Sequence, residues 1–180
     1  MTGLATPLSH LAVPLALTVA LGPDIVPPGL MALALVCAVL PDLDALGLWL
    51  GVPYEHPFGH RGLTHSLAFA VALAGMGALL APAAGALPET AFGVLFVSAA
   101  SHGLLDAMTN GGLGIALFGP FSSRRIFLPW RVIEVSPLRL SALFSRRGLR
   151  VLRSEMRWVW APCAGVALAG VALRRLAGLV

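Results

Sequence analysis

The sequence predicts an all-α, polytopic membrane protein, a bundle of about five transmembrane helices with an arginine-rich loop before the last one. Hydrophobic residues make up 58% of the 180 residues and charged residues only 11%, a balance outside the range of soluble domains. Apolar runs of nearly the length that crosses a bilayer recur along the chain. Because lipid offers no partner for backbone N–H and C=O groups, each run is expected to be helical.

Five apolar runs are the candidate membrane spans of what we treat as one integral membrane domain, residues 1–180. The first run is short, and the second is interrupted by the sequence Pro41-Asp42-Leu43-Asp44. Proline-rich turns separate the first run from the second and the third from the fourth. The five runs extend over residues 8–21, 29–50, 63–80, 90–108 and 158–173.

All twelve basic residues are arginines, and they are distributed unevenly between the two sides of the predicted bundle. Nine lie between Arg124 and Arg157, in the expected loop over residues 110–157, and Arg61 falls on the same side. Positive residues favour the cytoplasmic side, so we expect the N-terminus and this loop in the cytoplasm. Nucleic-acid binding is not expected, since these arginines stand between apolar spans rather than on a polar basic face.

Seven histidines and aspartates lie within the apolar runs or at their ends, where ionisable groups are costly. Tracing the runs back and forth across the bilayer puts all seven on the side where the first run begins. Chance would scatter them over both sides, so we expect one shared site. Imidazole and carboxylate are ligands of divalent ions such as zinc, and this many ligands suits one to three ions. The seven are His10, Asp42, Asp44, His60, His65, His102 and Asp106.

Local spacing indicates how these side chains meet. His102 and Asp106 are four residues apart, so on a helix they share one face. Asp42 and Asp44 would diverge on a regular helix, and Pro41 is expected to unwind the chain there.

The segment that enters the third run is expected to hold His60 in a loop, Thr64 as a helix N-cap and His65 in the first turn. Taken singly, each of these motifs has a commoner structural role. His-x-x-x-Asp is often a hydrogen-bonded pair within a bundle, Asp-x-Asp a helix cap or solvated turn, and a lone histidine an interfacial residue. Only their convergence on one side favours a metal site.

Three sequence blocks carry a resemblance to a known family. They are Leu-Pro-Asp-Leu-Asp over residues 40–44, Gly-His-Arg-Gly-Leu-Thr-His-Ser over 59–66, and Ser-His-Gly-Leu-Leu-Asp-Ala-Met-Thr-Asn-Gly-Gly over 101–112. Residues 127–130, 135–138 and 147–160 add weaker similarity. The chain resembles the YdjM-like family of bacterial inner-membrane proteins, which are described as membrane-bound, metal-dependent hydrolases. The resemblance covers most of the chain and implies a multi-pass protein of the bacterial inner membrane.

That family is distantly similar to zinc-dependent phospholipase C and related single-strand nucleases, helical enzymes that cleave phosphate esters with clustered zinc ions. The similarity extends to His102 and Asp106 and, more loosely, to Asp42 and His65. The further histidine and glutamate ligands of those enzymes have no counterpart after Asp106, where this chain departs from their pattern.

The expected function is hydrolysis of a phosphoester, with lipid-linked esters among the candidates, by a metal-activated water at the cytoplasmic face. Arg61 is expected to clamp a substrate phosphate, or else to face lipid headgroups. Asp44 or Asp42 would be a general base rather than a ligand. The alternative function is a non-catalytic, metal-binding structural or stress-response membrane protein. Metal transport is disfavoured, because the other halves of the spans are apolar.

Overall fold

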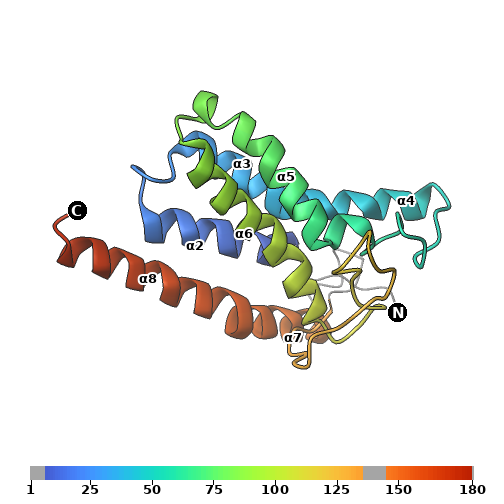
Figure 1. Cartoon of the computed structure of the whole chain (residues 1–180). Helices are drawn as coiled ribbons and strands as arrows, with labels where there is room; N and C mark the ends of the chain where they lie inside the picture. The colour runs from blue at the N-terminus through green and yellow to red at the C-terminus, as the bar shows by residue number, and fades with distance from the viewer. Residues whose placement is uncertain (1–6, 136–144, 180) are drawn as a thin grey trace.

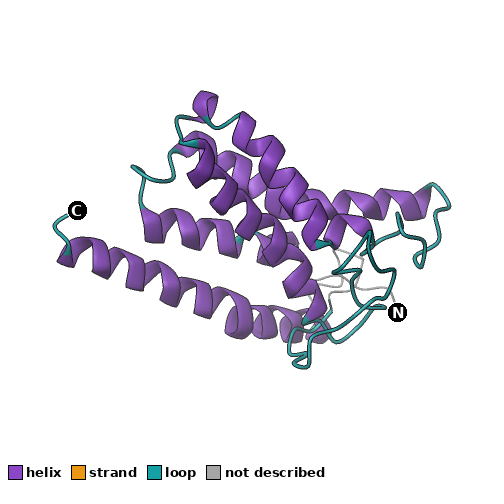
Figure 2. Cartoon of the chain, in the orientation of Figure 1, coloured by secondary structure: helices purple, strands orange, loops and turns teal. Residues whose placement is uncertain are grey.

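The computed structural model describes residues 7–135 and 145–179, and over these residues the chain is helical with no β-strand (Figures 1 and 2). The predicted all-α class is confirmed. The elements are α1 (Pro7–His10), α2 (Ala12–Leu21), α3 (Pro28–Val39), the 3-10 helix η1 (Leu40–Asp44), α4 (Ala45–Trp49), the 3-10 helix η2 (Leu63–His65), α5 (Leu67–Leu79), the 3-10 helix η3 (Pro82–Ala84), α6 (Pro88–Ala107), α7 (Arg146–Glu155), the π-helical turn η5 (Met156–Trp160) and α8 (Ala161–Leu176).

Three helical stretches are long and apolar enough to cross a membrane: Pro28–Trp49, Pro88–Ala107 and Arg146–Leu176. Two shorter apolar helices, Leu8–Leu21 and Leu67–Leu79, accompany them. These five stretches coincide with the five predicted runs. By length alone, three of these stretches are long enough to cross a membrane completely. The prediction of five crossings therefore stays a prediction.

The helices pack side by side around α6. Helix α6 lies between α3 and α5, while α8 packs along α2 (Figure 1). The core between α3, α5 and α6 is built from aliphatic residues such as Leu30, Leu73 and Leu95, with many alanines between them. Small residues let helix backbones approach closely in a membrane, where packing rather than water exclusion drives association.

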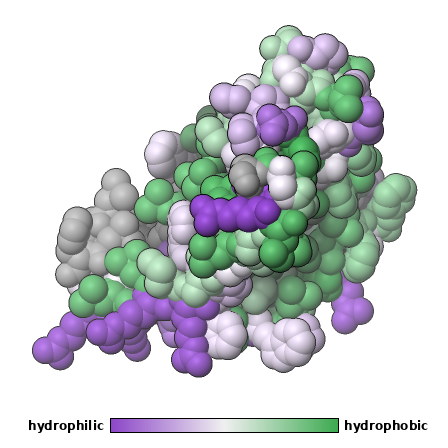
Figure 3. Space-filling model, turned by 90° about the vertical axis from the view of Figure 1, so that its left-hand side faces the viewer, coloured by the Kyte–Doolittle hydropathy of each residue, from purple (hydrophilic) through white to green (hydrophobic). Residues whose placement is uncertain are grey.

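The end of the bundle that holds the α2–α3 turn and the C-terminus is mostly apolar on its surface (Figure 3). The helices carry large exposed aliphatic side chains on their outer faces, among them Val36, Leu168 and Leu173. Such a surface is expected of a protein whose surroundings are lipid rather than water.

The expected arginine-rich loop ends in a helix. Residues 146–155 form α7, which runs through η5 into α8 as one helical stretch, Arg146–Leu176. The side chain of Ser145 caps this helix by accepting a hydrogen bond from the Gly148 N–H. Arginines and leucines here alternate with helical spacing, so the charge that suggested a loop instead marks one face of an amphipathic helix. Residues 136–138 of the weaker family similarity lie outside the described residues.

Two local breaks in the helices position the polar residues. As expected, Pro41 coincides with unwinding of the second run, because α3 ends at Val39 and the chain continues as the 3-10 helix η1. The N-cap of α5 is Ser66, whose hydroxyl accepts from the Phe69 N–H. The predicted Thr64 cap is therefore wrong, and the Thr64 hydroxyl instead donates to Asp44.

Candidate metal centre

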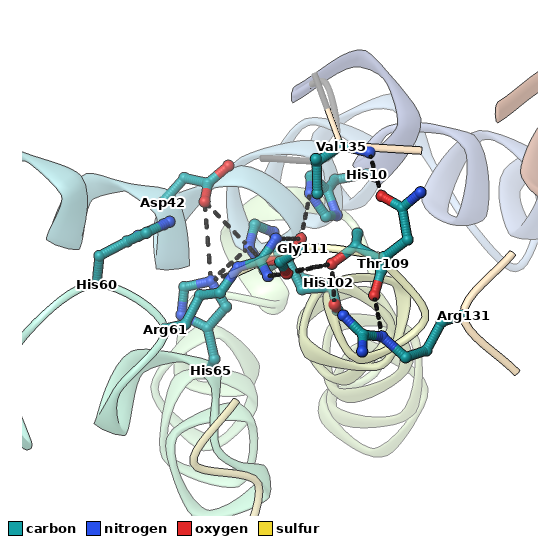
Figure 4. A network of polar contacts seen from close by, with 12 residues as sticks. His10, Asp42, His60, Arg61, His65, His102, Thr109, Gly111, Arg131 and Val135 are labelled. Carbon is teal, nitrogen blue, oxygen red and sulfur yellow. Dashed lines mark hydrogen bonds and ion pairs between the residues drawn. The ribbon is translucent and has the colours of Figure 1, made fainter. Parts of the chain in front are cut away.

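Four separate segments bring all seven predicted residues to one end of the bundle. Figure 4 shows His10, Asp42, His60, His65 and His102 of this set. His10 ends α1, both aspartates of the second run lie in η1, His60 and His65 precede α5, and His102 and Asp106 lie in the last turns of α6. Asp42 and His102, which are 60 positions apart in the sequence, thus lie within a few ångströms of each other.

An inner group, defined as Asp42, His65, His102 and Asp106, offers one ligand atom from each residue, all within 4.8 Å of one another. The two imidazole Nε2 atoms lie 3.0 Å apart. Asp106 Oδ2 is 3.3 Å from His65 Nε2, and Asp42 Oδ1 is 3.4 Å from His102 Nε2. These four atoms could hold one divalent cation.

Outer contacts orient both imidazoles toward this point. His102 Nδ1 lies 2.7 Å from the Ala38 carbonyl oxygen, and because a carbonyl only accepts, Nδ1 carries the proton. The lone pair of His102 Nε2 then faces the inner group. His65 Nδ1 likewise faces Asp44 Oδ2 at 3.2 Å, which leaves its Nε2 directed inward. A carbonyl or carboxylate behind a histidine is the usual partner that fixes a ligand's orientation at a metal.

Three of the four carboxylate oxygens of the inner group lack a hydrogen-bond donor among the described residues. Among the described residues, Asp42 Oδ1, Asp42 Oδ2 and Asp106 Oδ2 are buried atoms with no hydrogen-bond partner. An unpaired buried carboxylate oxygen is costly, and a cation removes that cost. Imidazole nitrogen and carboxylate oxygen are the ligands that zinc and other first-row ions prefer. The residues present therefore fit a divalent metal.

The field at His65 favours positive charge. Burial lowers the pKa of this imidazole, but its contacts with the carboxylates of Asp106, Asp42 and Asp44 outweigh burial and raise the pKa to about 10. The ring belongs to η2, the short turn that precedes α5, and its side chain is fully buried. A proton or a metal cation at Nε2 is thus strongly stabilised by its surroundings.

An outer group, Asp44, His60 and His65, also has ligand atoms within 4.8 Å of one another, but here the carboxylate is occupied by donors. Asp44 Oδ1 accepts from His60 Nδ1 at 2.6 Å. Asp44 Oδ2 accepts from the Arg61 N–H at 3.1 Å and from the Thr64 hydroxyl at 2.5 Å. His60 Nε2 is buried without a partner among the described residues. Asp44 therefore acts on the site through the histidines that it holds.

His10 lies beside these groups rather than in them. Its ring stacks on the His102 ring, with centroids 3.7 Å apart, and its Nε2 is 4.0 Å from Asp106 Oδ1. It is fully buried, and both its ring nitrogens lack hydrogen-bond partners among the described residues. His10, which the sequence suggested as a ligand, thus lies outside the inner group and packs against the His102 ring.

Arg61 has a partner other than the substrate phosphate that we expected. Its guanidinium is fully buried and donates to Asp106 Oδ1 at 2.9 Å, to the Thr109 hydroxyl and to the Gly111 carbonyl. Its φ of 62° lies in the left-handed region, which is rare for a residue with a side chain. This conformation turns the side chain inward, where its charge balances Asp106 and leaves Oδ2 facing the inner group.

Sequence reasoning missed three residues that support the site. Thr64 and Thr109 lie inside the family blocks, close in sequence to His65 and Asp106. This proximity was the signal that could have identified them. Arg125 had no such signal, because it is 65 residues from the carbonyl of His60 that it contacts at 2.9 Å. It also donates to the Tyr54 carbonyl and lies over the Tyr54 ring. The hydrogen bonds of Arg125 thus connect the backbone of Tyr54 with that of His60. Burial lowers the Arg125 pKa and raises that of Tyr54.

Comparison with known proteins identifies relatives among inner membrane proteins. The chain is 41% identical over 169 residues to "Inner membrane protein YbcI" of Escherichia coli (strain K12), which covers 92% of this chain and 95% of that protein. It is 34% identical over 87 residues to "Inner membrane protein YdjM" of the same strain, 44% of each chain. No solved structure matches the chain significantly.

The family described as "YdjM inner membrane protein" matches residues 5–178, nearly the whole chain. The match includes every residue of the inner and outer groups and all of the helices described above. The predicted bacterial inner-membrane location agrees with the printed names of the relatives. The chain therefore belongs to the YdjM family of inner membrane proteins.

Proposed function

We propose that this protein is a membrane-bound, metal-dependent hydrolase that cleaves a phosphoester, with lipid-linked esters as the favoured class. The observation that carries this proposal is the inner group. Four potential ligand atoms converge there, and three carboxylate oxygens lack hydrogen-bond partners among the described residues. The Asp42 side chain is 15% exposed, whereas those of His65, His102 and Asp106 are fully buried. Water and substrate would therefore approach the inner group from the side of Asp42.

The chain's own residues divide the work as follows. His65, His102 and Asp106 would hold a divalent ion, and zinc matches this ligand set best. Such an ion lowers the pKa of a bound water to about 7 and polarises a phosphoryl oxygen. Asp42 contributes Oδ1 to the ligand set, and its Oδ2, which has no protein donor, is placed to accept a proton from the attacking water.

Asp44 and Arg61, both expected to be catalytic, are assigned positioning roles in this proposal. Three hydrogen-bond donors besides His65 already occupy Asp44, which disfavours it as a general base. The guanidinium of Arg61 is enclosed by Asp106, Thr109 and Gly111, which disfavours direct contact with substrate. Each acts through a ligand: Asp44 through His65, and Arg61 through Asp106.

We assign the centre to the cytoplasmic side of the membrane. In the topology expected from the sequence, ten of the twelve arginines, Arg61 and the nine from Arg124 to Arg157, fall on the side of the centre, and such an excess favours the cytoplasmic side. With five crossings, the C-terminus would then be periplasmic. A reporter fused after Val180 is expected to be active in the periplasm, and a cytoplasmic reading would contradict this orientation.

A structural role for the metal is the second candidate, and one observation favours it. Three of the four inner ligands are fully buried, and four protein ligands complete the coordination of a structural zinc site. In that case the ion would only tie η1, η2 and α6 together. The two candidates differ in turnover, not in metal binding.

The test measures metal content and hydrolysis on the same preparations. Purified wild type, His65→Ala and Asp106→Asn would be loaded with zinc and assayed on a phosphomonoester, a phosphodiester and a lipid phosphate. The wild type is expected to bind zinc and turn over at least one substrate, and both variants to lose both properties. Asp24→Asn, an exposed carboxylate in the α2–α3 turn, is the matched control and is expected to behave as wild type. Zinc binding without any turnover would support the structural candidate.

A further inference from the structure

Helix α7 carries a basic face that the bundle does not use. Arg146, Arg150 and Arg153 are spaced four and three residues apart, so their side chains emerge on one side of the helix. The residues that α7 buries against the rest of the protein are Gly148, Val151 and Glu155, which lie on the opposite side. The three arginines are therefore directed away from the bundle, and all are exposed.

These arginines have no carboxylate to balance them within the described part of the chain. The arginine found in an ion pair there is Arg61, with Asp106. Like charges one helical turn apart repel each other. Together with Leu149, the three arginines line an open hollow of about 430 Å³. The basic face thus combines unbalanced positive charge with room for an anionic group.

The position of α7 decides what that anion is. The stretch Arg146–Leu176 has 31 residues, about 46 Å of helix, against a hydrocarbon core about 30 Å thick. When the apolar part in α8 crosses the bilayer, α7 must extend into the headgroup layer. Exposed Trp158 and Met156 lie at this boundary, as aromatic and apolar residues at membrane interfaces commonly do.

α7 also lies at the same end of the bundle as the metal centre. Val159, just beyond α7, packs with Leu105 of α6 and Ala12 of α2, and Leu105 precedes the ligand Asp106 in the chain. In Figure 1, α7 lies beside the end of α6 that carries the centre. The headgroups that reach the basic face therefore belong to the leaflet on the metal-centre side.

We propose that the Arg146–Arg150–Arg153 face of α7 binds the phosphate of an anionic phospholipid headgroup. Guanidinium groups bind phosphate oxygens through paired N–H donors, and the exposed leucines beside them, Leu149 and Leu152, contact the lipid's apolar part. Lipid binding at α7 and hydrolysis at the metal centre are separate properties, so either can be absent without the other.

The test compares short-chain phosphatidylglycerol with short-chain phosphatidylcholine, both below their micelle-forming concentration, on delipidated full-length protein in neutral detergent. Thermophoresis gives the two dissociation constants. Wild type is expected to prefer phosphatidylglycerol, and the preference should fall with added salt because surface charges are screened. Equal affinity for the two lipids, or a preference that salt does not change, would overturn the proposal.

A matched pair of variants locates the site. Arg150→Gln with Arg153→Gln removes the two charges nearest the hydrocarbon core, and should lower phosphatidylglycerol affinity about 25-fold, about a factor of five for each arginine near an anionic surface. Arg124→Gln with Arg175→Gln removes two exposed charges elsewhere and should leave the affinity unchanged. Equal losses in both variants would overturn the assignment to α7. Competition by inorganic phosphate as strong as by the lipid would show a soluble phosphate site instead.

Discussion

The inner and outer groups share His65 but use their carboxylates in opposite ways. In the outer group both oxygens of Asp44 accept from protein donors, at 2.5 to 3.1 Å. In the inner group Asp42 and Asp106 together leave three oxygens without donors among the described residues. A carboxylate that the protein has already satisfied positions its neighbours, whereas one left unsatisfied requires a ligand. Two clusters of similar composition therefore have different roles.

Arg61 connects the two groups and explains how they stay distinct. Its backbone N–H donates to Asp44 and its guanidinium donates to Asp106 Oδ1. Arg61 thus donates a hydrogen bond to the Asp44 carboxylate of the outer group and pairs with one oxygen of the Asp106 carboxylate of the inner group. The left-handed backbone at Arg61 lets the N–H and the side chain serve both groups.

The largest expected effect comes from Arg61→Gln. The substitution leaves Asp106 as a buried carboxylate without its cation, so the free energy of unfolding should fall by about 3–5 kcal/mol. Denaturant unfolding in detergent, followed by circular dichroism without added metal, measures the change. Saturating zinc should restore part of the loss, because the ion also neutralises Asp106.

Arg124→Gln is the control for this substitution, since Arg124 is exposed, and its effect should be within about 0.5 kcal/mol. A loss below about 1 kcal/mol in Arg61→Gln would show that the Arg61–Asp106 pair does not balance the site as described.

Asp42→Asn tests whether the inner group needs its unpaired carboxylate. The change removes an anionic ligand but breaks no hydrogen bond to Asp42 oxygens among the described residues. Zinc affinity, measured by competition with a chelating dye, should fall at least 100-fold, beyond the range for loss of an outer partner. The stability of the metal-free protein should also fall, because the Asp42 carboxylate is one of the charges that raise the His65 pKa. Zinc affinity within tenfold of wild type would remove Asp42 from the ligand set.

Asp44→Asn is expected to have a smaller effect on the metal. The amide keeps the shape of the carboxylate but weakens its hold on His65 and His60, so zinc affinity should fall 10- to 100-fold with one ion per chain in both proteins. Elemental analysis gives the ion count. Two ions in wild type and one in Asp44→Asn would instead make the outer group a second metal site.

Much of the centre follows from residue type and order along the chain. Helical runs that cross back and forth bring their alternate ends together, which is why seven ionisable residues on one side could be grouped without coordinates. The break at Pro41 follows from the missing N–H of proline. Thr64 was placed wrongly, since a hydroxyl before a helix can cap it or bond elsewhere. The nearby Asp44 carboxylate, a long-range partner, accepts the Thr64 hydrogen bond, and Ser66 caps α5.

Hydrophobic content and spacing were thus sufficient to predict a helical membrane bundle with seven of its histidines and aspartates at one end. The separation of ligands from their supports required the folded chain. His10 and His102 are both histidines of the predicted common site. His102 directs its Nε2 at the inner group, whereas His10 stacks on the His102 ring. Arg61 and Asp44 likewise gained their partners only in three dimensions. Spacing along a chain sets which residues can meet, whereas hydrogen-bond direction and burial depend on neighbours that are distant in sequence.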